Sequence, residues 1–340
     1  MKKNFNGVLV EINRANTDRL IDWLEVHNFY RVPASVGHHN AASGGLLKHS
    51  LEVCNEALYL RSVAIKENPS IADKLPKESV AIAALLHDIC KWNVFYISSN
   101  SGEARCNKDA RGEGHGLKSL RILESLGFPL TEDEKLAIWW HMGKDHEPSY
   151  ADHQDEYEKS CDSELAVLIR KADYNATHLK ERFEETLDSL TGLDVPRLKR
   201  YLSGSNFYTH HSGSHHHYST GLVAHSLGTW RHMMQVYDGD NRNEAAAIAL
   251  LHDIAMQNRT RKYGGHGWRS KEILKSRLHL GLSDEALRCV EYHKKHHIPR
   301  CQEEIDIRES LLWKKLYESD HFDADHDITD VYKHFMDERF

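Results

Sequence analysis

The sequence has no apolar run that approaches the ~20 residues needed to span a bilayer. Its N-terminus, MKKNFNGVLVEI, lacks the long apolar core of a signal peptide. Its six cysteines form no CxxC pair, which favours reduced thiols over a disulfide framework. We therefore expect a cytoplasmic protein with no membrane partner.

The chain also lacks an excess of basic residues. It contains 44 Lys and Arg residues and 51 Asp and Glu residues, so the formal net charge is −7. Proteins with an extended nucleic-acid surface show a strong basic excess, so we expect no such surface here. The net charge is still compatible with a local basic pocket for phosphate. A length of 340 residues fits about two domains of ordinary size.

Alternating strand patterns are almost absent, and we predict an all-α fold. Thr131 followed by Glu134 is a helix start of the capping-box type. Apolar residues recur at helical spacing in several segments, namely 16–28, 46–65, 76–87, 115–127, 131–141 and 163–187. Residues 93–114 are predicted to form a polar loop.

Histidine is unusually abundant, with 26 residues. An apolar run ends in an adjacent His–Asp pair in AIAALLHDICK, residues 81–91, which holds His87 and Asp88. The same arrangement recurs in AIALLHDIAMQ, residues 247–257, with His252 and Asp253. A repeated buried His–Asp pair predicts a repeated metal site.

The second half of the sequence repeats the order of motifs in the first. VEYHKKHH echoes IWWHMGKDH, and KLYESDHFDA echoes LIRKADYNAT. The connection from His252 to His266 is half as long as that from His87 to His115, which is typical of ligands on fixed helices joined by variable loops. Gly192 and Pro196 interrupt the helical pattern, so we place the domain boundary there and predict domains 1–192 and 193–340.

The two halves offer matching sets of candidate metal ligands. These are His49, His87, Asp88, His115, His141 and Asp173 in the first half, and His225, His252, Asp253, His266, His293 and Asp320 in the second. Imidazoles and carboxylates bind Fe, Mn, Co, Ni or Zn, and a bundle core is a usual place for such ligands. Each set exceeds the needs of one tetrahedral zinc. It therefore predicts either two carboxylate-bridged metals or one metal with histidines left for the substrate.

Lys91 follows His87 by one helical turn, so it would share the ligand face and meet a phosphate; the alternative is an ordinary solvated lysine at a helix end. A metal pair polarises a phosphoryl oxygen and generates hydroxide near neutral pH. We predict Asp88 and Lys91 as catalytic residues. Arg111, in the basic loop 93–114, is a candidate for contact with an anionic substrate.

These motifs resemble the HD-domain metal-dependent phosphohydrolase superfamily. GGLLKHS, HDICK, GHGLKS, WHMG and RKADYNA carry the resemblance in the first half, and GLVAHS, HDIA, GGHG, EYHKK and ESDH carry it in the second. The resemblance implies two tandem HD-type helical bundles, each with a metal site in its core. The first half is also similar to the HD domain of bacterial 3′–5′ exoribonucleases and some conjugative relaxases, without the accessory nucleic-acid-binding domain of those exonucleases.

The resemblance also implies roles for individual residues. His49, His87, Asp88 and Asp173 would hold one metal, and Asp88 would bridge to a second metal held by His115 and His141. Lys91 would contact phosphate, and His39 would touch the substrate.

The resemblance of the second half implies an equivalent pair of metals, so that each domain would hold two. It has Met256 where the first half has Lys91, and Arg259, Arg261 and Lys262 precede its GGHG motif.

We therefore expect a phosphohydrolase or phosphodiesterase that cleaves a nucleotide or a short oligonucleotide with metal-activated hydroxide. Two alternatives use nearly the same ligands. One is a mixed-valent diiron oxygenase of the HD superfamily, and the other is a non-catalytic tandem protein that senses a nucleotide.

Overall fold

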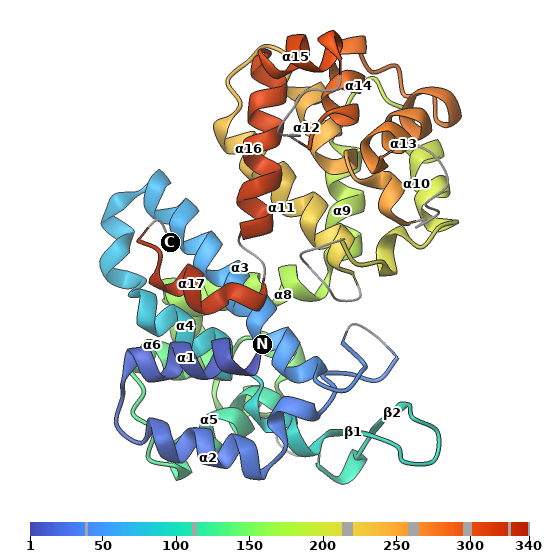
Figure 1. Ribbon diagram of the computed structural model, residues 1–340. Coiled ribbons are helices and arrows are strands. Elements are labelled where there is room, and N and C mark those ends of the chain that lie inside the picture. Colours follow the sequence, from blue (N-terminus) through green and yellow to red (C-terminus); the bar gives the residue numbers. More distant parts are fainter. Residues whose placement is uncertain are drawn as a thin grey trace. The chain divides into compact units, whose positions relative to one another are not determined.

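The computed structural model describes residues 1–37, 40–110, 114–212, 220–257, 265–294, 301–325 and 328–338. These residues are mostly helical (Figure 1), and the only strands among them are β1 (Phe95–Ile97) and β2 (Ala104–Cys106), an antiparallel pair. The predicted all-α fold is confirmed. Within these ranges, no helix combines the length and apolarity that crossing a membrane requires.

The chain forms two compact units. The first unit comprises Met1–Thr177 together with Ile328–Phe340, and the second comprises His178–Asp327. Residues 178–192, which the sequence assigns to the first domain, belong to the second unit. The last segment of the chain returns to the first unit.

The first unit contains nine α-helices in its described residues, and short 3₁₀ helices connect several of them. The α-helices are α1 (Lys2–Ile12), α2 (Thr17–Val26), α3 (Gly45–Glu67), α4 (Lys77–Leu86), α5 (His115–Ser125), α6 (Glu132–Trp139), α7 (Gln154–Asp162), α8 (Glu164–Thr177) and, after the second unit, α17 (Val331–Met336).

The centre of the first unit is α3, which packs against α4 and α8. Residues 80–86 of α4 are fully buried because this run contains only Val, Ala, Ile and Leu. The predicted capping box is confirmed, since Thr131 Oγ1 accepts from the backbone N–H of Glu134, whose carboxylate accepts from the backbone N–H of Thr131.

The second unit repeats this arrangement of packed helices around α11. Its α-helices are α9 (Leu179–Asp188), α10 (Val195–Ser203), α11 (Gly221–Val236), α12 (Arg242–Leu251), α13 (His266–Glu272), α14 (Asp284–Glu291), α15 (Gln302–Arg308) and α16 (Leu311–Asp325). Helix α11 packs against α12 and α16. Residues 245–251 of α12 are buried, as their Ala, Ile and Leu side chains require.

A glycine follows His115 in the first unit and His266 in the second, and each glycine allows two helices to approach closely. A Cβ atom on Gly116 would lie 1.7 Å from the carbonyl oxygen of Trp139, and one on Gly267 would lie 2.4 Å from that of Glu291. Only glycine fits such contacts without a shift of the backbone. Helix α5 therefore packs closely on α6, and α13 on α14.

The single helix predicted over residues 163–187 is wrong. Helix α8 ends at Thr177 and α9 begins at Leu179. The helical period continues through the break, but the two parts pack in different cores. Helix α8 packs against α3, whereas Phe183 and Leu187 of α9 belong to the apolar cluster of the second unit. The predicted loop 93–114 also contains the β1–β2 hairpin.

Candidate metal centres

Five of the six candidate ligands in the first unit converge in its core. His49 lies on α3, His87 and Asp88 follow α4, and Asp173 lies on α8. His141 follows α6. All five side chains are buried. We call this set the first centre.

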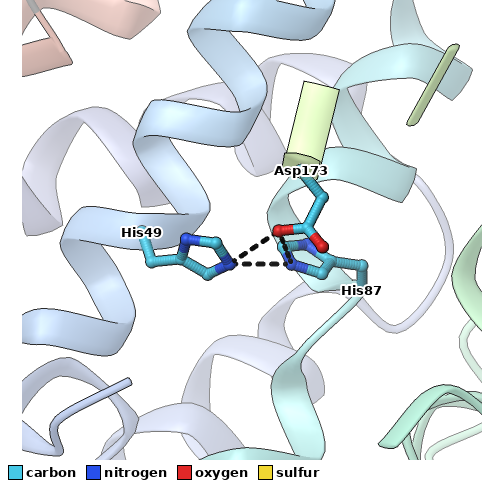
Figure 2. A group of neighbouring side chains, drawn as sticks. All are labelled: His49, His87 and Asp173. Atoms are coloured by element: carbon cyan, nitrogen blue, oxygen red, sulfur yellow. Dashed lines mark hydrogen bonds and ion pairs between the residues drawn. The ribbon is translucent and has the colours of Figure 1, made fainter. Parts of the chain in front are cut away.

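One group in the first centre combines His49, His87 and Asp173 (Figure 2). His49 Nε2 lies 3.1 Å from Asp173 Oδ1 and 3.2 Å from His87 Nε2. Ring nitrogens and a carboxylate oxygen that converge in this way can share one cation, for which they are suitable ligands.

Asp88 connects this group to a second one, formed by His87, Asp88 and His141. Asp88 Oδ2 lies 3.3 Å from His87 Nε2, while Asp88 Oδ1 lies 3.5 Å from His141 Nε2. Asp88 Oδ1 and His141 Nε2 are buried and make no hydrogen bond within the described structure. Because unpaired buried polar atoms are costly, this arrangement fits a metal ion that both atoms would bind.

His115 is the sixth candidate, and no metal-type group among the described residues includes it. Its side chain is partly exposed, and its Nδ1 lies 3.9 Å from Cys90 Sγ. The structure therefore brings together five of the six residues that the sequence singles out in this half.

Lys91 does not lie on the helix that the sequence predicts. Helix α4 ends at Leu86, and the chain continues as the 3₁₀ helix η3 (Ile89–Asn93). This tighter turn brings Lys91 Nζ to 2.5 Å from Asp88 Oδ2, and 14% of the lysine side chain is exposed. Lys91 is therefore a half-buried cation beside the ligand group and not a solvated lysine at a helix end.

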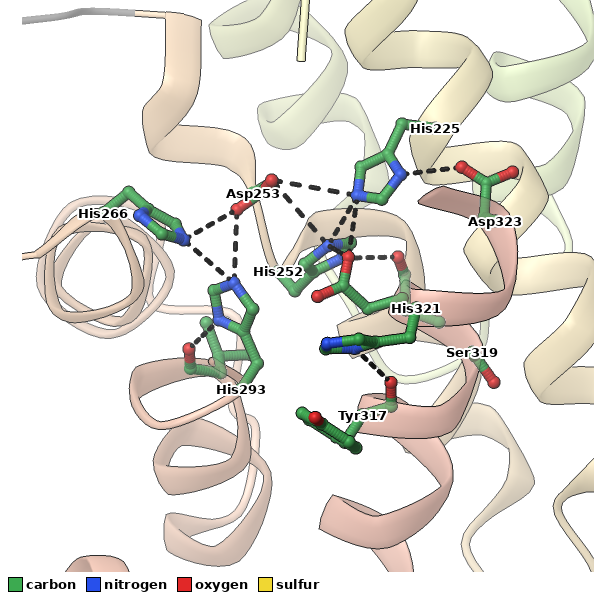
Figure 3. Close-up of polar contacts among 12 residues, drawn as sticks. His225, His252, Asp253, His266, His293, Tyr317, Ser319, His321 and Asp323 are labelled. Carbon is green, nitrogen blue, oxygen red and sulfur yellow. Dashed lines mark hydrogen bonds and ion pairs between the residues drawn. The ribbon is translucent and has the colours of Figure 1, made fainter. Parts of the chain in front are cut away.

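In the second unit all six candidate ligands converge in overlapping groups. Figure 3 shows His225, His252, Asp253, His266 and His293 among them. We call this set the second centre. His225 on α11 places Nε2 at 3.1 Å from both His252 Nε2 and Asp320 Oδ1. His252 follows α12, and Asp320 lies on α16.

Asp253 joins the two halves of the second centre. Its Oδ2 lies 3.8 Å from His225 Nε2, and its Oδ1 lies 3.4 Å from Nε2 of both His266 and His293. His266 Nε2 and His293 Nε2 are 3.0 Å apart. Each oxygen of Asp253 thus faces a different pair of imidazoles, which is the arrangement that a bridging carboxylate needs.

Hydrogen bonds to Nδ1 fix which ring nitrogen faces each centre. The Nδ1 atoms of four histidines bond to the carbonyl oxygen three residues earlier, at distances of 2.7–3.0 Å; these are His87, His141, His252 and His293. A carbonyl only accepts, so Nδ1 carries the proton and Nε2 is directed to the centre.

Charges in the first centre shift the pKa values of its members. Burial alone would lower the pKa of His49, but hydrogen bonds to Asp173 and Asp88 raise it to about 9. Burial would raise the pKa of Asp88, but Lys91 and His87 hold it well below its usual range. Asp88 is therefore ionised at neutral pH, and a metal ion that binds His49 has to displace a proton.

The second centre shows a similar pattern. Burial would lower the pKa of His225, but Asp320 and Asp323 raise it to about 10. Burial lowers the pKa of His266 to about 4, so that this ring is neutral, as a metal ligand has to be. Burial would raise the pKa of Asp253, but the neighbouring histidines lower it.

Asp323 is a further residue of the site that the sequence pattern did not single out, and it accepts a hydrogen bond from His225 Nδ1 at 2.7 Å (Figure 3). The available signal is the second aspartate in ESDHFDA, one helical turn after Asp320. Two predicted substrate residues, His39 and Arg111, lie outside the described residues, as do Arg259, Arg261 and Lys262.

The HD domain family model matches residues 46–177 and 222–325, which is more than half of the chain. Comparison with curated proteins and with solved structures gave no match. The matched segments contain every candidate ligand of both centres. The chain belongs to the HD domain family, whose members are in general hydrolases that bind divalent metals.

Proposed function

We propose that the chain is a metal-dependent phosphodiesterase that cleaves a nucleotide or a short oligonucleotide at the first centre. Membership of the HD domain family supports a phosphohydrolase. The observation that carries the proposal is the position of Lys91, 2.5 Å from Asp88 inside a group of buried metal-type ligands. A phosphate at this place would meet a cation as well as the ligand group.

Two divalent ions per unit, of Fe, Mn, Co, Ni or Zn, are the proposed cofactors. In the first centre His49, His87 and Asp173 would hold one ion, Asp88 would bridge, and His141 with His115 would hold the other. In the second centre His225, His252 and Asp320 would hold one ion. Asp253 would bridge, and His266 with His293 would hold the other ion. Such ions polarise a phosphoryl oxygen and lower the pKa of water.

The residues of the chain would orient and neutralise the substrate. Lys91 would donate to a phosphate oxygen and balance its negative charge, which is more effective in a buried site than in water. Burial would lower the pKa of Lys91, but Asp88 and Asp173 raise it, so the amine is protonated at neutral pH. Asp88 stays ionised and bridges the ligand groups.

Lys91→Met tests this proposal, because it introduces the residue that the second unit has at the matching position. We expect hydrolysis of bis(4-nitrophenyl) phosphate to fall by about a hundredfold in kcat/KM, the scale of losing one charge-stabilising group. Metal content should stay at the wild-type level. Lys135→Met, which changes a partly exposed lysine on α6, is the control. Equal rates in Lys91→Met and wild type would refute the proposal.

A non-catalytic role for the second centre is the second candidate. Met256 stands where Lys91 stands in the first unit, and it packs against the apolar core of the second unit. A thioether cannot balance the charge of a phosphate. Asp253→Ala should therefore lose metal from the second centre and keep phosphodiester hydrolysis. A loss of hydrolysis in this variant would instead make the second centre catalytic.

A further inference from the structure

Asp323 lies behind the second centre, on the side of His225 away from the other ligands. It is on α16, one turn after Asp320, and is 8% exposed. Its Oδ2 lies 2.7 Å from His225 Nδ1, while His225 Nε2 lies 3.1 Å from Asp320 Oδ1. The His225 ring is therefore held at both nitrogens by carboxylates of the same helix.

Gly228 provides the space for this contact. It lies on α11, three residues after His225, and a Cβ atom there would be 1.6 Å from Asp323 Oδ1. Glycine within a helix costs about 1 kcal/mol relative to alanine. The close approach of the Asp323 carboxylate is a physical reason for a glycine at this position.

The first unit lacks this pair of residues. Counting from His49 and Asp173, the matching positions are Glu52 and Ala176. Glu52 forms an ion pair with Lys48 at 3.1 Å and accepts a hydrogen bond from Asn40 at 2.7 Å. Ala176 has no side-chain acceptor. The aspartate and the glycine therefore occur together in the second unit alone.

We propose that Asp323 is a positioning residue of the second centre. Its carboxylate accepts the Nδ1 proton of His225, directs Nε2 to the metal and raises the basicity of that nitrogen. Gly228 makes this contact possible, because it has no Cβ atom to clash with the carboxylate. The inference rests on the proposed metal binding by the second centre and does not depend on hydrolysis.

Cobalt binding by the full chain tests the proposal, with His87→Ala present throughout to weaken the first centre. Anaerobic Co²⁺ titration, followed by visible absorption, reports the affinity of the second centre. Asp323→Ala should weaken Co²⁺ binding by about 10–100-fold, the usual cost of losing such a partner. Asp323→Asn should recover most of the affinity, because its amide oxygen can accept the same proton. Gly228→Ala should also weaken binding, because its Cβ displaces the carboxylate.

Ser319→Ala is the matched control. Ser319 is buried on the same helix and contacts His232 Nδ1 at 3.0 Å, so its loss removes a polar contact between α11 and α16 without touching a ligand. Its Co²⁺ affinity should match that of the parent.

A second readout separates positioning from general loosening of the fold. In Zn²⁺-loaded protein with ¹⁵N-labelled histidine, one downfield Nδ1–H signal should disappear in Asp323→Ala and persist in Ser319→Ala. Unchanged Co²⁺ affinity and an unchanged signal in Asp323→Ala would overturn the proposal. Wild-type protein that binds Co²⁺ without hydrolysing phosphodiesters would refute the proposed function and leave this inference intact.

Discussion

At the scale of single residues, one carboxylate organises each centre. Asp88 and Asp253 each direct one oxygen toward the ligands of one group and the other oxygen toward a second group. A carboxylate used in this way can bind one cation through each oxygen, whereas a histidine that directs only Nε2 to the centre offers one ligand atom. The centres differ in what surrounds this carboxylate. Three histidines and a lysine lie beside Asp88 in the first centre, whereas four histidines lie beside Asp253 in the second.

His293→Ala should remove one of the two proposed ions of the second centre. It disrupts both groups that contain His293, but leaves the group of His225, His252 and Asp253 in place. We expect metal content to fall by about one ion per chain, since a divalent ion held by only two protein ligands binds weakly. Elemental analysis after anaerobic reconstitution with Mn²⁺ measures this change.

His321→Ala is the control for that substitution. His321 is an exposed histidine on α16 whose Nδ1 bonds to the Tyr317 carbonyl oxygen, and its loss should leave the metal content unchanged. Equal metal content in His293→Ala and His321→Ala would contradict the assignment of His293.

The repetition of the His–Asp motif was enough to predict which residue types would meet. The spacing could not predict how single side chains turn. His115 and His266 occupy matching positions in the sequence, yet only His266 belongs to a metal-type group in the described structure. The contact of Asp323 with His225 could not be predicted either. It depends on the close approach of the Asp323 carboxylate to Gly228, which belongs to a different helix.

At the scale of elements, the start of α6 is stabilised by an ion pair between Glu134 of this helix and Arg14, which lies outside it. Arg14 donates two hydrogen bonds of 2.6 Å to Glu134, the fully buried carboxylate of the capping box. The pair therefore fixes α6, at whose end His141 lies.

Arg14→Ala should lower the free energy of unfolding by about 3 kcal/mol, because it leaves the Glu134 carboxylate buried without its charged partner. Urea denaturation measures this loss. Lys135→Ala, which breaks an exposed ion pair on the same helix, should cost less than about 1 kcal/mol. A loss of the same size in both variants would contradict the account of α6.

The same pair gives stability a definite dependence on pH. Burial would raise the pKa of Glu134, but hydrogen bonds from Arg14, Ser79 and Thr131 lower it. A lowered folded pKa contributes stability that is present above the usual glutamate pKa of about 4.3 and is lost as the pH falls through the folded value. Arg14→Ala should therefore lose less stability on acidification than the wild type does.

The positions of most helices were predictable from apolar periodicity. The break between α8 and α9 was not, because residues 163–187 keep a helical period throughout. What separates these helices is tertiary packing, since α8 packs on α3 of the first unit and α9 supplies Phe183 to the core of the second.

At the scale of the whole molecule, the first unit is completed by the last segment of the chain. Helix α17 packs against α1 and α3, and it buries Val331 and Phe335. His334 Nδ1 also lies 2.6 Å from Asn55 Oδ1 of α3. No periodicity in the sequence indicates that residues after the second unit belong to the first.

Deletion of residues 328–340 should therefore destabilise the first unit. Losing the three buried apolar side chains of this segment, Ile328, Val331 and Phe335, costs about 5–9 kcal/mol. Differential scanning calorimetry should show a lower unfolding temperature for the first unit, while Co²⁺ affinity at the second centre stays unchanged. A truncated chain with unaltered unfolding would contradict the assignment of α17 to the first unit.

The proposed function is the hydrolysis of phosphodiesters at the first centre. The most direct measurement is the rate of bis(4-nitrophenyl) phosphate hydrolysis by the anaerobically Mn²⁺-loaded full chain, compared between wild type and Asp88→Ala at equal folded concentration. The proposed function requires turnover by the wild type and a loss of at least about a hundredfold in Asp88→Ala. Equal rates in the two proteins, or no turnover by metal-loaded wild type, would contradict it.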